Sequence, residues 1–291
     1  RSGRIALVYA EGEIVDGEGE PGQIGGSRLS RELRKLRQDA GVKAVVLRVN
    51  SPGGSASAAE VIQREVRLIK AVKPLVVSMG SYAASGGYWI SAYADRIFAE
   101  PATITGSIGV FGLQFDVQKL AGSFGVTFDS VKTGRFADAL TIARPKTPEE
   151  LAVLQRMVDW IYGEFVAKVA EGRQLTPEKV ESIAQGRVWS GADAVEVGLV
   201  DELGGLDAAI AHAAAKAGLG HDYRLSEYPR PKELIEAIQE LLERTVPGST
   251  RSTRSLTGQL TARLEAELKT LAAFNDPRGI YARLPLTFSV R

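Results

Sequence analysis

Two glycine-rich turns hold the residues of this sequence whose types and spacing best suit chemistry. Residues 50–54 read Asn-Ser-Pro-Gly-Gly, and residues 83–88 read Ala-Ala-Ser-Gly-Gly-Tyr; each turn follows an apolar run and precedes a helical pattern. A glycine turn that leads into a helix exposes backbone N–H groups, and the helix N-terminus adds a partial positive charge there. The pattern therefore favours an oxyanion hole or another anion site.

Ser85 lies in the middle of the second turn, where its hydroxyl would stand beside the N–H of Gly86. The N–H of Gly53 or Gly54 would be the second donor, so the two turns together could present a serine nucleophile beside an oxyanion hole. Plainer interpretations stay open, because glycine turns are common in α/β proteins and a serine before a helix is usually an N-cap. Neither turn has the glycine spacing of a P-loop or of a dinucleotide-binding fold.

Alternating strands and helices must position these turns. Apolar runs predict strands at residues 4–9, 44–49, 75–79, 96–99, 108–115 and 126–131. Helices are expected around residues 29–36, 62–69 and 85–93, and the six glycines and five acids of residues 11–26 suggest a mobile loop. Strands that alternate with helices indicate βα crossovers and a largely parallel sheet, which is covered on both faces and therefore apolar throughout.

From Thr147 onward the pattern is helical. Residues 147–150 (Thr-Pro-Glu-Glu) and 176–178 (Thr-Pro-Glu) each read as a helix start, with a cap and a proline at the first helical position. Two further helices are expected within residues 190–217, separated by a break at 203–205. Beyond them we expect helices near 231–243 and 259–273, joined by a linker near 245–258.

The amino-acid composition excludes several kinds of catalytic and metal site. The 291 residues are 44% hydrophobic and 24% charged with a net charge of +1, which indicates a globular chain without an overall field that favours nucleic acid. There are no cysteines, so thiol nucleophiles, disulfides and thiolate metal sites are excluded. The only histidines are His212 and His221, which leaves little for a histidine base, whereas glycine is enriched at 31 residues.

One segment could be a membrane-spanning helix by its length and lack of charge. Residues 75–94 carry no charge over twenty positions, a length that could span a bilayer. Their glycines, serines and tyrosines favour a buried strand followed by a helix instead. The first residues run directly into a strand-like segment and show no signal peptide, so the chain as given is expected to be soluble.

A third motif, residues 105–110 (Thr-Gly-Ser-Ile-Gly-Val), completes a recognisable set. With residues 50–54 and 82–89 it closely resembles the signal peptide peptidase A, or protease IV, family, and the resemblance runs from about Ile5 to at least Leu206. The resemblance implies an α/β fold shared with Clp protease and the crotonases, a repeated ββα spiral core with added C-terminal helices. It also implies a Ser–Lys dyad serine endopeptidase that acts on apolar peptides left in the membrane after signal peptide cleavage.

The resemblance also implies a role for each motif position. Ser85 is the nucleophile, Gly86 with Gly53 or Gly54 forms the oxyanion hole, and Ser107 takes the place of the serine that hydrogen-bonds the lysine base. The scarcity of histidine agrees with this, because a desolvated lysine can serve as the base. No metal or cofactor is expected, and an extended substrate would pair with a strand edge near the site.

The sequence differs from the family pattern at the position of the lysine. In the short members a lysine follows a strand and a Gly-x-Tyr-Lys-like turn, and the matching stretch here, residues 133–138, has Ala137 at that position. The chain resembles instead the C-terminal half of the long, duplicated members, whose N-terminal half supplies the lysine. Lys132 and Lys146 lie nearby in sequence but are expected at the surface. Alone, the chain should be weakly active or inactive.

Two other functions stay open. A crotonase-like acyl-CoA enzyme would use the same pair of N–H donors but would need a carboxylate pair in its pocket. A non-catalytic pseudo-peptidase or assembly subunit would explain Ala137 directly.

The expected organisation is a peptidase domain at residues 1–220 and a helical C-terminal extension at residues 221–291. Residues 244–291 carry a net charge of +5, which suits docking on another subunit or on an acidic surface, or a solvated helix. The resemblance implies a homo-oligomer, and a location at a bacterial-type cell membrane with the catalytic domain outside the bilayer. Attachment would be peripheral or through an N-terminal segment that is absent from this chain.

Overall fold

The structure, a computed structural model, describes residues 3–229, 274–276 and 279–284. Within them, the larger sheet has the strand order β10-β8-β6-β4-β1-β12, with β7 paired to β6 and β11 paired to β7. All neighbouring pairs are parallel except β10 with β8. The strands are β1 (Gly3–Glu11), β4 (Val42–Ser51), β6 (Leu75–Ala84), β7 (Arg96–Ala99), β8 (Ile104–Gly106), β10 (Val188–Ser190), β11 (Glu202–Leu203) and β12 (Tyr223–Tyr228).

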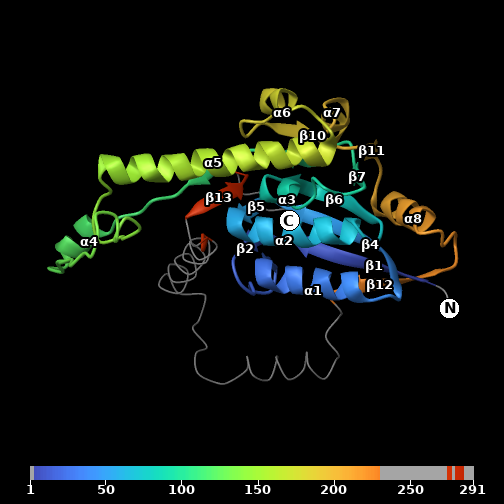
Figure 1. Cartoon of the computed structure of the whole chain (residues 1–291), viewed down its shortest axis with the longest axis horizontal. Helices are drawn as coiled ribbons and strands as arrows, with labels where there is room; N and C mark the ends of the chain where they lie inside the picture. The colour runs from blue at the N-terminus through green and yellow to red at the C-terminus, as the bar shows by residue number, and fades with distance from the viewer. Residues whose placement is uncertain (1–2, 230–273, 277–278, 285–291) are drawn as a thin grey trace, which may run out of the picture.

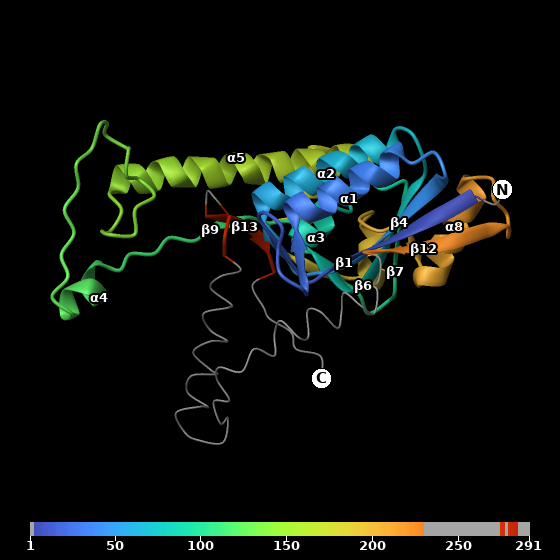
Figure 2. The same cartoon turned by 90° about the horizontal axis from the view of Figure 1, so that it is seen from below.

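A smaller sheet lies beside the first and has the strand order β3-β2-β5-β13-β9. Its strands are β2 (Glu13–Val15), β3 (Gln23–Gly25), β5 (Gly53–Ser55), β9 (Phe111–Gly112) and β13 (Ile280–Arg283). β13 is antiparallel to both of its neighbours, β5 and β9. The strand β13 is therefore inserted between two elements that come from the first half of the chain; Figure 1 shows it beside β5, and Figure 2 shows it beside β9.

Helices cover both faces of the larger sheet. α1 (Gly26–Gln38) and α2 (Ala56–Lys70) lie side by side against one face, and α8 (Leu206–Lys216) lies against the other (Figure 2). The short α3 (Gly86–Trp89) follows β6, and the long α5 (Pro148–Arg173) passes over it, with Trp89 against Phe165 at a ring-centroid distance of 4.4 Å. α6 (Pro177–Ile183) and α7 (Gly191–Glu196) lead toward α8.

The strands divide their side chains between two cores, as the period of two in a strand requires. Ala6 and Val8 of β1 belong to the core beneath α1 and α2, whereas Ile5 and Leu7 belong to the core beneath α8. All four side chains are at most 1% exposed. This confirms the expected α/β fold with a mainly parallel sheet that is covered on both faces.

Residues 113–147, which include α4 (Gln118–Ser123), form an arm that extends away from the sheets to the far end of α5 (Figures 1 and 2). Several large apolar side chains on this arm are exposed: Phe115, Leu120, Phe124, Val126, Phe128, Val131, Phe136, Leu140 and Ile142. The strand expected at residues 126–131 is not formed, because this stretch lies along the arm without a partner strand.

Other elements differ from expectation in their bounds. The strand expected at residues 108–115 is reduced to the two-residue β9. The preceding strand, β8, ends at Gly106, before the expected strand begins. The helix expected at residues 85–93 is reduced to the single turn of α3. Residues 11–26 are more ordered than a loop, since β2 and β3 pair in parallel within them and bury Ile14 and Ile24.

The described part of residues 221–291 contains two strands and no helix. β12 extends the larger sheet beyond β1, and β13 lies in the smaller sheet, so both belong to the sheets of the first 220 residues. The helices expected near 231–243 and 259–273, and most of the basic segment 244–291, lie outside the described residues.

Residues 75–94 form β6, α3 and the turns that follow, and all of them except Tyr82 and the exposed Ser81 are buried, as the sequence predicts. In the described part of the chain, no helix combines the length and the apolar character that crossing a bilayer requires.

The start of α5 carries a pH-dependent contribution to stability. Glu150 closes the capping box with Thr147 and accepts two hydrogen bonds from Arg144 (2.6 and 2.9 Å). Arg144 and then the Thr147 N–H lower the pKa of the Glu150 carboxyl to about 2. Because this pKa is below that of the unfolded chain, the stabilisation is complete above about pH 4.5 and is lost as the pH falls toward 2.

We therefore expect the thermal midpoint of wild type to fall between pH 5 and pH 2 by more than that of Glu150→Gln, which has no carboxyl to protonate. Melting curves followed by circular dichroism across this range measure the difference. Parallel pH profiles for the two proteins would contradict the assignment.

Candidate active site

Ser85 occupies a strained position at the junction of β6 and α3. Its backbone has φ +52° and ψ −113°, a conformation that side chains other than glycine rarely adopt. The Ser85 N–H donates to the Gly106 carbonyl over 2.8 Å, and the Ser85 carbonyl accepts from the Trp89 N–H, also over 2.8 Å. The turn thus holds the hydroxyl between the end of a buried strand and the first turn of a helix.

The backbones of the two glycine turns meet beside Ser85. A Cβ atom added to Gly86 would lie 3.1 Å from the Gly53 Cα and 3.2 Å from the Gly54 nitrogen. Gly86 is the first residue of α3, so its N–H has no acceptor within the helix. The Gly53 N–H donates to the Ser51 hydroxyl over 3.1 Å, and Gly54 is paired with Ile14 of β2 and with Ala282 of β13.

Ser107 lies in the segment that wraps around Ser85. The neighbouring Gly106 accepts from the Ser85 N–H, and the Ser85 Oγ donates to the Gly109 carbonyl over 3.3 Å. Ser107 also has a positive φ of +48°, its N–H donates to the Arg187 carbonyl over 2.7 Å, and its side chain is 2% exposed. The structure therefore brings Ser85, Gly86, Gly53, Gly54 and Ser107 together, as the motif spacing predicts.

Ala137 is not part of this cluster. It is exposed on the arm, where its N–H donates to the Gly134 carbonyl. Lys132 and Lys146 lie on the same arm: Lys132 pairs with Asp138 at 2.7 Å, and the Lys146 amine donates to the Thr141 carbonyl. Among the described residues, no lysine or histidine side chain is hydrogen-bonded to the Ser85 hydroxyl.

Lys73 is partly buried but has a structural role. Burial lowers the pKa of the Lys73 amine, which donates to the carbonyls of Leu36, Asp39 and Val42 over 2.9–3.0 Å. These contacts tie the end of α2 to the turn that follows α1.

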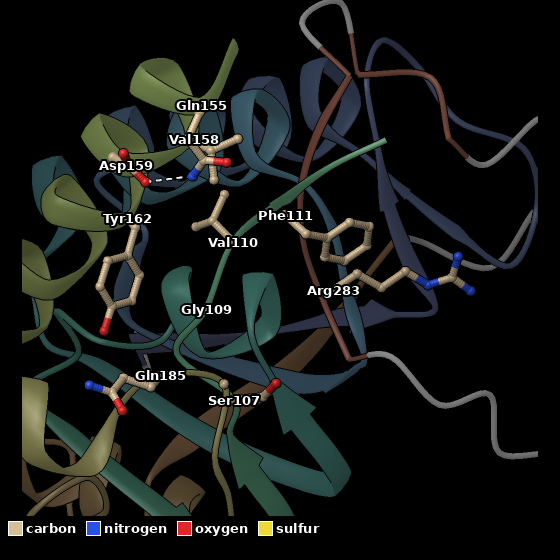
Figure 3. A pocket seen from close by; sticks show the side chains of 11 residues that line it. Ser107, Gly109, Val110, Phe111, Gln155, Val158, Asp159, Tyr162, Gln185 and Arg283 are labelled. Carbon is tan, nitrogen blue, oxygen red and sulfur yellow. Dashed lines mark hydrogen bonds between the residues drawn. The ribbon is translucent and has the colours of Figure 1, made fainter. Parts of the chain in front are cut away.

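A cavity of about 440 Å³ opens next to Ser107, between α5 and the segment that joins β8 to β9 (Figure 3). Val110, Phe111 and Val158 give it apolar walls, and Gln155, Asp159, Tyr162 and Gln185 add polar groups. Burial and a hydrogen bond to Glu181 raise the pKa of Tyr162 to about 12, so its hydroxyl stays protonated at neutral pH. The cavity offers space for a substrate side chain directly beside the serine cluster.

Comparison with known proteins decides the family. The model of Peptidase family S49 matches residues 67–220, which is more than half of the chain and includes Ser85 and Ser107. The chain belongs to peptidase family S49.

Two relatives show how the S49 chain aligns with longer proteins. It is 43% identical to Protease 4 of Salmonella typhi over 96% of its own length and 46% of the relative's. It is 37% identical to the chloroplastic serine protease SPPA of Arabidopsis thaliana over 89% of its length and 39% of the relative's. The chain thus spans about half the length of the curated relatives it matches. A solved ClpP1 mutant from Listeria monocytogenes aligns with a TM-score of 0.47 and 17% identity, covering 70% of this chain and 94% of that one.

The two histidines of the S49 chain lie apart from the serine cluster. His212 is on α8, on the opposite face of the larger sheet, with its ring 5.6 Å from that of Phe98; burial lowers its pKa. His221 is exposed after α8. Within the described ranges, no group of three or more His, Asp or Glu side chains could hold a metal ion.

The aromatic residues that flank Ser85 in sequence are mainly core residues. Tyr88 is fully buried and its hydroxyl donates to the Leu199 carbonyl over 2.8 Å, while the Trp89 indole donates to Glu60 over 3.1 Å. Burial raises the pKa of Tyr88 well above its ordinary value. Only Tyr82 is partly exposed.

Sequence reasoning missed β13, whose residue Arg283 also lines the cavity. The sequence signal for this strand is weak. It consists of five residues of alternating size after Gly279, more than 160 positions from the motif at residues 105–110. Nothing in a run that short says which strand it pairs with.

Proposed function

We propose that this chain carries the nucleophile and the oxyanion hole of a serine peptidase that hydrolyses apolar peptides, with Ser85 as the nucleophile. The observation that carries the proposal is the strained Ser85 turn, which stands beside the N–H of Gly86 at the start of α3 and the backbone of the first glycine turn. Membership of family S49 and the serine protease relatives support the same chemistry.

In the proposed reaction the Ser85 Oγ attacks the carbonyl carbon of the scissile bond as its proton passes to a neutral amine. The negative charge that develops on the carbonyl oxygen is stabilised by the N–H of Gly86 and by that of Gly54 or Gly53. The same amine then gives its proton to the leaving nitrogen, and water later hydrolyses the acyl-enzyme. Ser107 would hold the amine by a hydrogen bond.

The base in this proposal is a lysine from outside the chain. The described residues place no lysine at the Ser85 hydroxyl, and the chain spans less than half of the length of its Protease 4 relative. An N-terminal half or a second copy of the chain would supply the amine, and in the second case the working form is a homo-oligomer. The exposed apolar side chains of the arm are suited to contact such a partner.

Chemical rescue tests the proposal. Hydrolysis of a fluorogenic apolar peptide by the isolated chain should be slow and should rise with the concentration of added propylamine, because a free amine can replace a missing base. Ser107→Ala should weaken this response through the apparent affinity for the amine. Rapid hydrolysis that does not respond to amine would show that the site is already complete, and no hydrolysis at any amine concentration would favour a pseudo-peptidase.

A further inference from the structure

The basic residues of this chain are concentrated on two adjacent helices. α1 and α2 carry eight basic and three acidic side chains, a net charge of +5, whereas the remainder of the chain carries −4. The two helices lie side by side at the surface, against one face of the larger sheet (Figures 1 and 2). A chain whose total charge is nearly zero therefore has one strongly basic side. The eight basic residues are Arg28, Arg31, Arg34, Lys35 and Arg37 of α1 and Arg64, Arg67 and Lys70 of α2.

α1 separates its apolar and basic side chains onto opposite faces. The three leucines of the helix are buried. Residues three and four positions apart share a helix face, so Arg28, Arg31 and Lys35 lie together on the outward face. The side chains of Arg31 and Lys35 are 55% and 66% exposed. We call this outward face of α1, together with Arg34 and with Arg64 of α2, the basic face.

A buried carboxylate gathers arginines from both helices at the edge of the basic face. Glu65 of α2 is 1% exposed and accepts hydrogen bonds from Arg34 over 3.1 and 3.2 Å. It also accepts from Arg37 and from Arg64, each over 3.3 Å. Because one negative charge meets three positive charges, this cluster keeps a net charge of +2. The side chains of Arg34 and Arg64 are 54% and 65% exposed, so much of that charge faces the solvent.

The remaining ion pairs of the basic face are exposed and therefore weak. Arg31 pairs with Glu18 at 2.5 Å, and both side chains are more than half exposed. Lys35 lies 3.7 Å from Glu32, and Arg28 donates to two backbone carbonyls, which carry no formal charge. Exposed pairs contribute little to stability and are screened by salt, so these side chains can exchange their partners for external anions.

We propose that the basic face is a docking surface for a bilayer that contains anionic phospholipids. A guanidinium binds a phosphate with two parallel hydrogen bonds, and clustered basic residues on an amphipathic helix are attracted to a negatively charged leaflet. Arg28 and Lys35 are seven residues apart, which is about 10 Å along α1, so one soluble phosphate cannot contact both. A surface of many separate headgroups can contact the whole face at once.

This docking surface goes beyond the proposed function, which needs no lipid. The apolar peptides of that function partition into bilayers, because transfer out of water is favourable for apolar surface. Docking through the basic face places the chain at the surface where such peptides collect.

Co-sedimentation of the full chain with vesicles tests the proposal. We expect binding to vesicles of phosphatidylcholine and phosphatidylglycerol in equal parts to be at least tenfold tighter than binding to phosphatidylcholine alone. This binding should weaken as the ionic strength rises from about 0.1 M to about 0.5 M, because exposed charges are screened. Arg31→Gln/Arg34→Gln/Arg64→Gln, which removes three charges from the basic face, should bind the mixed vesicles at least tenfold more weakly than wild type.

A matched variant removes the same charge from other surfaces. Lys179→Gln/Lys216→Gln/Arg224→Gln changes exposed residues of α6, α8 and β12 and should bind the mixed vesicles as wild type does. An equal loss in the two triple variants would make the attraction a diffuse charge effect and overturn the proposal. So would full binding by both variants, or equal binding to the two kinds of vesicle.

A second measurement leaves every residue of the basic face in place and so guards against misfolding. The chain has no cysteine, so Gln38→Cys and Ala211→Cys each carry a single dye, at exposed positions of α1 and α8. Mixed vesicles that include a lipid with a nitroxide headgroup should quench the dye at position 38 at least twofold more strongly than the dye at position 211. Equal quenching, or stronger quenching on α8, would show that another face meets the bilayer.

These readouts involve neither Ser85 nor turnover. If Ser85 is not the nucleophile, vesicle binding still reports on the basic face. If the basic face does not bind lipid, the amine response of peptide hydrolysis, measured without vesicles, still reports on Ser85. The two proposals can therefore fail separately.

Discussion

Replacing Ser85 by alanine is expected to abolish amine-stimulated peptide hydrolysis, with a fall of at least a thousandfold, because the variant lacks the proposed nucleophile. The substitution removes one oxygen atom, whose described hydrogen bond is the 3.3 Å contact with the Gly109 carbonyl. It also places alanine at φ +52°, a left-handed conformation that costs free energy for alanine as it does for serine. Initial rates of hydrolysis at a fixed propylamine concentration measure the effect.

The control for this variant is its fold, which circular dichroism compares with that of wild type. A hydrolysis rate within tenfold of wild type, with the fold unchanged by circular dichroism, would remove Ser85 from its proposed role.

The second large effect is expected at Gly53, where even one methyl group has no room. Gly53 has φ +96°, and its Cβ would lie 2.6 Å from the Gly86 nitrogen and 2.1 Å from the Ala282 oxygen. Gly53→Ala must therefore displace Gly86, β13 or both. We expect hydrolysis to fall at least a hundredfold, the usual cost of losing one oxyanion donor, and the free energy of unfolding to fall by about 1–2 kcal/mol.

Gly163→Ala is the matched control for this substitution. Gly163 lies on α5, and a Cβ atom there would meet nothing within 4 Å. Alanine in a helix interior is favoured over glycine by about 1 kcal/mol, so this variant should be slightly more stable and fully active. Urea unfolding and hydrolysis rates measured on both variants separate the two effects. If Gly53→Ala hydrolyses peptide as fast as Gly163→Ala, the oxyanion hole does not involve the first turn.

Local patterns in the sequence predict most of the framework and the centre of the site. The strand of residues 44–49 is apolar at nearly every position because both faces of β4 are buried, which a single window can reveal. The turns at Gly53 and Ser85 are equally local, since the chain conformations they need exclude most side chains. Motif spacing is therefore enough to group Ser85, Gly86 and Ser107 into one site.

The features that escape prediction depend on distant pairing. β13 is a short run whose place is set by β5 and β9, neither of which its own residues specify. Residues 126–131 have the alternation of a strand, but a strand needs a partner, and the arm provides none within the described residues. In the proposed function the base is the extreme case, because a lysine supplied from outside the chain would leave no trace in the sequence except Ala137.

Covalent labelling tests the central claim most directly. The chain is treated with a fluorophosphonate in the presence of propylamine, and the modified residue is identified by mass spectrometry of its peptides. We predict one adduct per chain, on Ser85, formed faster as the amine concentration rises and absent from Ser85→Ala. An adduct on another residue, or labelling that persists in Ser85→Ala, would contradict the assignment of the nucleophile.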